Sequence, residues 1–179
     1  MGYAKWFVGL MASALLGGVV CSADQPMPEY RAKVALLEKL TRFVNWPEGA
    51  LSPQHPFRLA IIGRTPFGDE LENYFASHPL KNRPVSIQYF TTPSEIRDCD
   101  LLFVCASEQG RLGILLATVR SRPFLIVGDT PGFAQRGLMI NIVGENGRMI
   151  FEVNLGAVRE SGFRMHPGFL QLVRIAAHN

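Results

Sequence analysis

Residues 124–154, with the sequence FLIVGDTPGFAQRGLMINIVGENGRMIFEVN, decide the fold. The apolar run 124–127 predicts a buried strand, and residues 130–132 (TPG) have the composition of a turn. The Asn-Gly pair at 146–147 lies between two runs of alternating apolar residues, and this dipeptide is the strongest short-range signal for a β-hairpin. No set of catalytic residue types is evident in this sequence, which therefore indicates a scaffold or a contact surface.

A two-residue turn fixes the register of this hairpin, because a slip by one residue would move every side chain to the other face. The register places two apolar pairs on one face: Ile142 with Phe151 and Ile140 with Val153. It places the more polar pairs on the other face: Asn141 with Glu152 and Met139 with Asn154, with Glu145 facing Arg148 beside the turn. We therefore expect a half-buried antiparallel pair whose apolar face lies toward the core.

The rest of the chain alternates between helical and strand patterns. Before the hairpin, helices are expected at 29–45, 69–75, 92–97 and 110–120, and strands at 57–62, 84–90, 101–105 and 124–127. After it, helices are expected at 155–160 and 167–177. This alternation predicts an α/β fold with a mostly parallel sheet flanked by helices on both faces, and with the C-terminal antiparallel β-hairpin extending the sheet.

The N-terminal segment has the features of a secretory signal peptide. Lys5 gives a positive start, residues 7–20 are apolar, and residues 21–23 (CSA) supply the small side chains that signal peptidase reads. We expect residues 1–23 to be a cleaved signal peptide and residues 24–179 to form a single α/β domain in the periplasm of a Gram-negative bacterium. A retained membrane anchor is the alternative, although the apolar run is short for a bilayer span of about 20 residues.

The charge of the chain argues against nucleic acid as a partner. The full chain carries a formal net charge of +3, and loss of Lys5 with the signal peptide leaves +2. The basic residues are dispersed, and no Lys/Arg cluster interleaves with aromatic residues.

After cleavage, Cys99 and Cys105 are the remaining cysteines. Export favours a disulfide between them, because disulfides form and persist in oxidising compartments such as the periplasm. The residues between them, DLLFV, read as a strand, and six strand steps span about 20 Å. The Cα atoms of a disulfide lie within about 7 Å of each other. We therefore expect Cys99 and Cys105 not to pair with each other.

An enzymatic interpretation finds little support in the sequence. Residues 61–68 (IIGRTPFG) suggest a nucleotide-binding turn, but their spacing is not G-x-G-x-x-G and Pro66 removes an amide donor. Asp69 and Glu70 place negative charge where a phosphate would bind. The histidines are His55, His78, His166 and His178. None of them has a second ligand at metal-binding spacing. We therefore predict no enzymatic activity, no catalytic residue, no metal site and no cofactor.

Four residues are the candidate contacts for a partner or a ligand. Trp46, Phe67 and Phe133 fall in expected loops, where aromatic side chains either cover the rim of the core or form an exposed binding patch. Asp129 ends the fourth expected strand, at the sheet edge where ligands of α/β folds bind, although it also suits the start of a turn. The apolar segment 167–177 either packs on the core or docks a partner.

Several segments resemble, in order, the motifs of the YfiR-like family of periplasmic proteins. Residues 40–47 (LTRFVNWP) resemble its FVxWP motif, and residues 61–68 resemble its GxxPFG loop. Residues 99–104 (CDLLFV) resemble its CxxLFV strand. Residues 125–134 and 139–154 resemble its strand, turn and hairpin, which end in GRxxFEVN. The resemblance extends from about residue 30 to residue 175.

The resemblance implies a periplasmic repressor that binds the periplasmic sensor domain of an inner-membrane diguanylate cyclase. It would thereby lower cyclic-di-GMP signalling and biofilm formation. It also implies a homodimer and an outer-membrane lipoprotein that can sequester the repressor. The alternative is a periplasmic small-molecule sensor with a pocket at the carboxyl ends of the strands, near Gly63, Phe67 and Asp129.

Overall fold

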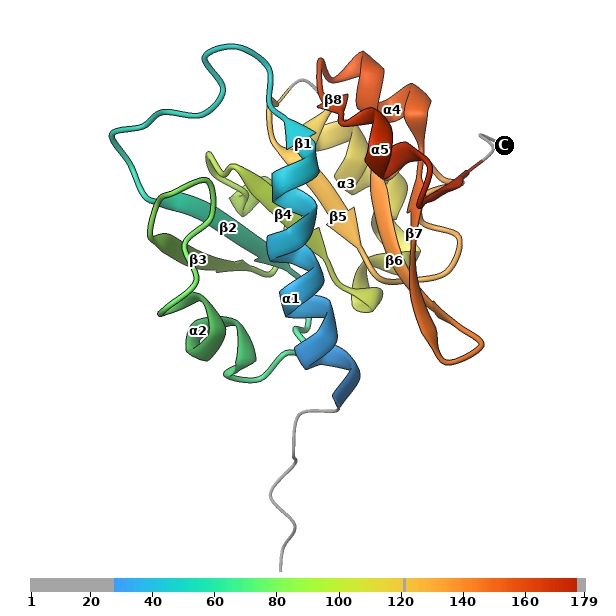
Figure 1. Ribbon diagram of the computed structural model, residues 1–179, viewed down its shortest axis with the longest axis horizontal. Helices are drawn as coiled ribbons and strands as arrows, with labels where there is room; N and C mark the ends of the chain where they lie inside the picture. Colours follow the sequence, from blue (N-terminus) through green and yellow to red (C-terminus); the bar gives the residue numbers. More distant parts are fainter. Residues whose placement is uncertain (1–27, 121, 177–179) are drawn as a thin grey trace, which may run out of the picture.

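A computed structural model describes residues 28–120 and 122–176 of the chain (Figure 1). The predicted signal peptide, residues 1–23, lies outside the described residues. No helix within the described part of the chain is long and apolar enough to span a bilayer.

The helices are α1 (Pro28–Phe43), α2 (Glu70–Phe75), α3 (Leu112–Val119), α4 (Leu155–Glu160) and α5 (Pro167–Leu170), with the 3₁₀ helices η1 (Pro93–Glu95) and η2 (Ala106–Arg111). The strands are β1 (Val44–Asn45), β2 (Phe57–Ile62), β3 (Val85–Phe90), β4 (Leu101–Val104), β5 (Leu125–Gly128), β6 (Ile140–Glu145), β7 (Arg148–Val153), β8 (Arg164–Met165) and β9 (Arg174–Ile175).

A seven-stranded sheet with the order β3-β2-β4-β5-β6-β7-β9 forms the centre of the molecule. The first five strands of this order are parallel, and β7 returns antiparallel to β6. Helix α1 crosses one face of the sheet beside α2, whereas α3 lies behind it and packs against η1 (Figure 1). The predicted α/β fold, with helices on both faces and an added hairpin, is confirmed.

The hairpin has the predicted register. Ile142 pairs with Phe151, Ile140 with Val153 and Glu145 with Arg148. The turn residues Asn146 and Gly147 have φ angles of 50° and 73°. Positive φ at both central residues is what a type I′ turn requires, and this turn matches the right-handed twist of the two strands.

The more polar face of the hairpin is buried as well, so the expectation of a half-buried pair is wrong. Asn141 and Glu152 are both buried. The segment that follows β5 covers this face, and its backbone supplies hydrogen-bond acceptors. Asn141 Nδ2 donates to Thr130 O at 2.8 Å, and Asn154 Nδ2 donates to Ala134 O at 2.9 Å. These bonds offset much of the cost of burying the two amides.

The expected helix 167–177 is also corrected. α5 ends at Leu170, and β9 instead pairs in parallel with β7, matching Arg174 to Glu152 and Ile175 to Val153. Without β9, the outer edge of β7 would expose unpaired backbone groups. Similarly, α1 ends at Phe43, and Val44 and Asn45 form β1, which pairs with β8.

Candidate functional site

Phe67 and Phe133, which are candidate contacts by sequence, lie in the core with no exposed surface. The ring of Phe67 packs edge-on at 4.9 Å from Phe103 and at 5.4 Å from Tyr30. Phe133 packs so closely on β5 that a Cβ atom at Gly128 would lie 3.0 Å from its ring. Both aromatic side chains therefore seal the core at the end of the sheet and present nothing to a partner in this structure.

Trp46 is half-buried and belongs to the rim of the core. Its indole Nε1 donates to Asp100 O at 2.9 Å, and its ring packs edge-on against Phe57 and Phe163. Lys81 Nζ lies 5.1 Å from the centre of the indole ring. The satisfied N–H and the aromatic contacts give Trp46 a structural role.

Asp129 takes part in a buried ion pair. Its Oδ2 lies 2.8 Å from Lys33 Nζ, which also lies 2.7 Å from a carboxylate oxygen of Glu29 and 4.4 Å from the centre of the Tyr30 ring. Burial opposes the charge of Lys33, but the hydrogen bonds with Asp129 and Glu29 outweigh burial and raise the pKa of the ammonium group. Asp129 thus ties the end of β5 to α1, and one of its two oxygens is committed to that contact.

The crevice between the carboxyl ends of β2 and β4, where this strand order places ligands, is filled by the protein itself. A Cβ atom at Gly63 would lie 2.4 Å from Ser107 Oγ and 2.7 Å from Glu108 Oε1. Ser107 Oγ also accepts a hydrogen bond from Arg64 N at 2.9 Å, and buried Glu108 pairs with Arg111. The ligand pocket expected near Gly63 therefore has no room beside this glycine.

Cys99 and Cys105 are free, buried thiols at the two ends of β4. Burial raises the pKa of both thiols to about 12. A thiol with so high a pKa has almost no thiolate at neutral pH, so neither is an activated nucleophile. Within residues 28–120 and 122–176, no group of three or more His, Cys, Asp or Glu side chains is placed to hold a metal ion.

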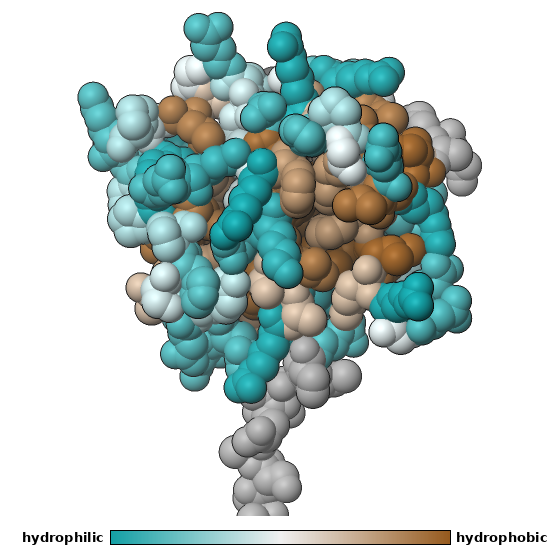
Figure 2. All heavy atoms as spheres, viewed as in Figure 1, coloured by the Kyte–Doolittle hydropathy of each residue, from teal (hydrophilic) through white to brown (hydrophobic). Residues whose placement is uncertain are grey.

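The most exposed apolar side chains on one side of the molecule surround α5 and β9. Leu172, Ile175 and Phe43 are 76%, 48% and 36% exposed. Phe169 stacks on Phe43 at 5.1 Å and contacts Phe151 at 5.3 Å, which joins the end of α1 to β7. We call Phe43, Phe151, Leu172 and Ile175 the C-terminal apolar surface; Phe169 is buried and packs against its two aromatic side chains. Figure 2 shows apolar side chains to the right of α1, where Figure 1 places α5 and β7.

The sequence analysis named the segment 167–177, which contains Leu172 and Ile175, as either core or docking surface, but it did not select Phe43 or Phe151. The available signal was the apolar content of 167–177, which is equally compatible with a core helix. The structure shows that Leu172 and Ile175 are exposed and that Ile175 belongs to a strand paired with β7.

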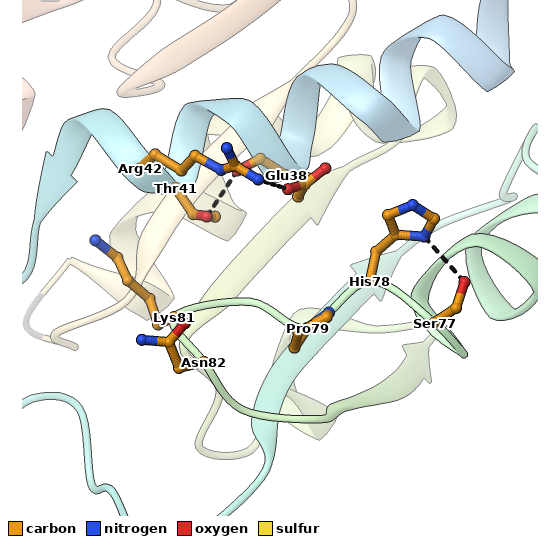
Figure 3. A pocket seen from close by; sticks show the side chains of 8 residues that line it. All are labelled: Glu38, Thr41, Arg42, Ser77, His78, Pro79, Lys81 and Asn82. Atoms are coloured by element: carbon orange, nitrogen blue, oxygen red, sulfur yellow. Dashed lines mark hydrogen bonds and ion pairs between the residues drawn. The ribbon is translucent and has the colours of Figure 1, made fainter.

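A second surface feature is a groove between α1 and the segment that joins α2 to β3, which we call the α1 groove (Figure 3). Its volume is about 460 Å³, within the range of small-molecule sites. It is lined by Glu38, Thr41, Arg42, Ser77, His78, Pro79, Lys81 and Asn82. None of these residues is a candidate contact by sequence.

The sequence of this chain also matches a known family of proteins. A family described as YfiR/HmsC-like matches residues 30–174. The chain belongs to the YfiR/HmsC-like family. This family is regulatory. A comparison with curated proteins gives no match.

Solved structures support the fold of this YfiR/HmsC-like chain. A conserved domain protein from Vibrio cholerae superposes with a TM-score of 0.59 at 8% identity, covering 83% of this chain and 60% of its own. The ABC domain in complex with L-Trp from a Streptococcus gives 0.57 at 11% identity, with the same two coverages. A substrate binding protein with adhesive properties from Clostridium difficile gives 0.52 at 13%, covering 71% of this chain and 56% of its own. The chain thus spans about 60% of the length of these neighbours.

Proposed function

We propose that this protein is an exported, non-enzymatic repressor that binds the periplasmic sensor domain of an inner-membrane diguanylate cyclase. Membership of the YfiR/HmsC-like family supports the regulatory role. In this proposal, residues 1–23 direct export and are removed, and binding lowers cyclic-di-GMP and biofilm formation. The repressor forms a homodimer, and an outer-membrane lipoprotein sequesters it when repression is relieved.

The observation that carries the proposal is the C-terminal apolar surface. Clustered aromatic and aliphatic side chains that remain exposed mark interaction sites, because isolated apolar residues are common on protein surfaces but contiguous groups are not. Leu172 and Ile175 are the most exposed members and would insert into the partner. The bound repressor must prefer the inactive conformation of the cyclase and so shift the population toward it.

Deletion of the gene and two matched point variants test this proposal. Deletion should raise cellular cyclic-di-GMP, and Leu172→Asp should reproduce the rise because it places a charge in the contact surface. Ile114→Asp is the control, since Ile114 is 69% exposed but lies on α3, at the opposite face of the sheet. It should repress like the wild type.

The link to a cyclase and the contact surface each have an outcome that would contradict them. An unchanged cyclic-di-GMP level on deletion would contradict the link to a cyclase. If deletion raises the level but Leu172→Asp represses normally, the contact surface lies elsewhere. Circular dichroism of both point variants establishes that neither effect is a failure to fold.

A further inference from the structure

The α1 groove lies between two segments that are far apart in the sequence. The last turns of α1 supply Glu38, Thr41 and Arg42, and the connection after α2 supplies the facing wall (Figure 3). Its ionisable side chains are Arg42, Lys81, Glu38 and His78. Which of these charges is already neutralised within the protein decides what ligand the groove can accept.

The carboxylate of Glu38 is fully engaged. Tyr74 Oη donates to its Oε2 at 2.7 Å, and the Arg42 guanidinium pairs with its Oε1. The hydrogen bond from Tyr74 and the pairing with Arg42 lower the pKa of Glu38 despite its burial. Glu38 therefore contributes little uncompensated negative charge to the groove.

Lys81 is in the opposite situation. Its ammonium group is half-buried, donates one hydrogen bond to Val44 O at 2.9 Å and lies over the Trp46 ring. Among the residues that the structure describes, no carboxylate lies within 4 Å of Lys81 Nζ. Burial lowers its pKa, as expected for a cation that has lost water without gaining a counter-ion.

The backbone around Lys81 is held in an unusual conformation. Leu80 and Arg83 exchange two backbone hydrogen bonds of 3.0 and 2.9 Å, and the two residues between them have φ angles of 50° (Lys81) and 60° (Asn82). A type I′ turn of this kind usually contains Asn-Gly, and a lysine rarely adopts the left-handed region. The turn fixes both side chains at the mouth of the groove (Figure 3).

We propose that the α1 groove binds a small carboxylate ligand, with the Lys81 ammonium and the Asn82 side-chain amide donating to the carboxylate. Arg42, which is largely exposed and pairs with Glu38 through one terminal nitrogen, adds positive charge at the entrance. The described residues supply no acceptor for the remaining protons of Lys81 Nζ or for the Asn82 amide. The carboxylate of the ligand would accept hydrogen bonds from both. The inference does not depend on the proposed regulatory function, because it concerns the purified protein alone.

A competing explanation is that Lys81 only donates to the Val44 carbonyl, directly after α1, where the end of a helix also favours a cation. The two explanations differ in whether an anion binds. Titration of the purified full chain with succinate, followed by amide NMR, distinguishes them. We expect saturable shifts confined to residues 77–82 and the end of α1. Succinamide, the neutral analogue, should produce none, and sulfate at equal ionic strength should not compete.

Two lysine-to-methionine variants complete the test. Lys81→Met should weaken succinate binding roughly tenfold or more, since a charge-assisted hydrogen bond contributes that much. Lys39→Met is the matched control, because Lys39 is exposed on α1 and does not line the groove. It should bind like the wild type. Absence of saturable binding, equal binding of sulfate, or unchanged affinity in Lys81→Met would each overturn the proposal, provided that the spectra show folded protein.

Discussion

At the scale of single residues, the buried pair of Lys33 and Asp129 gives Asp129 a structural role that its position at a strand end did not reveal. Asp129→Asn should lower the free energy of unfolding by about 2 kcal/mol, because buried Lys33 then keeps only the more exposed Glu29 as its counter-ion. Glu70→Gln removes the partner of exposed Arg31 and should cost less than about 1 kcal/mol. Urea denaturation measures both, and equal small losses would contradict the structural role.

The two thiols give a second prediction at this scale. Cys99 and Cys105 are buried with pKa values raised to about 12, so they should react very slowly with a thiol reagent at pH 8. Both should react at once in denaturant, which counts them as free. Rapid labelling of the folded protein would show that β4 opens, and a missing thiol in denaturant would show a disulfide.

Individual site residues were hard to predict because their environment is tertiary. Phe67 and Phe133 follow strands in loops by sequence, yet both rings turn back into the core. Gly63 resembles part of a nucleotide-binding turn, but Ser107 and Glu108, from a distant segment, occupy the space beside it. A local sequence pattern does not show which side chains a distant segment of the chain will cover.

At the scale of elements, the register of the hairpin was predictable because its signal is local, whereas the burial of its more polar face depends on the distant segment that covers it. Asn146-Gly147 determines the turn, and the turn determines each cross-strand pair. The C-terminal segment was not predictable, because its short apolar run suits a helix or a strand equally well. The free edge of β7 decides that Arg174 and Ile175 form a strand.

The hairpin also offers a prediction with an internal control. Gly147→Ala should destabilise the protein by about 1 kcal/mol or more, because φ is 73° there and alanine resists the left-handed region. A Cβ atom at Gly147 would meet no atom within 4 Å, so the cost is purely conformational. Gly144→Ala, in the same hairpin with equally open surroundings, should change stability by less than about 0.5 kcal/mol. Similar thermal shifts in both would contradict the assigned turn.

At the scale of the whole molecule, the end of α1 separates the two surfaces that carry the proposals. Phe43 belongs to the C-terminal apolar surface, whereas Thr41 and Arg42 line the α1 groove. Variants such as Leu172→Asp and Lys81→Met therefore test partner binding and ligand binding independently. The overall α/β arrangement was predictable from the alternation of patterns, but the position of these surfaces depends on how α1 lies across the sheet.

The contact between α1 and α2 should make the stability of the molecule depend on pH in the acidic range. Tyr74 and Arg42 lower the pKa of Glu38 in the folded protein, so the ionised carboxylate stabilises the fold at neutral pH. That contribution is complete above the unfolded pKa of about 4.3 and is lost as the pH falls through the lower folded pKa. Glu38→Gln should therefore be less stable than the wild type at pH 7, and the difference should shrink toward pH 3. Urea denaturation at the two pH values measures this difference, and a gap of equal size at both would show that the charge of Glu38 does not stabilise the fold.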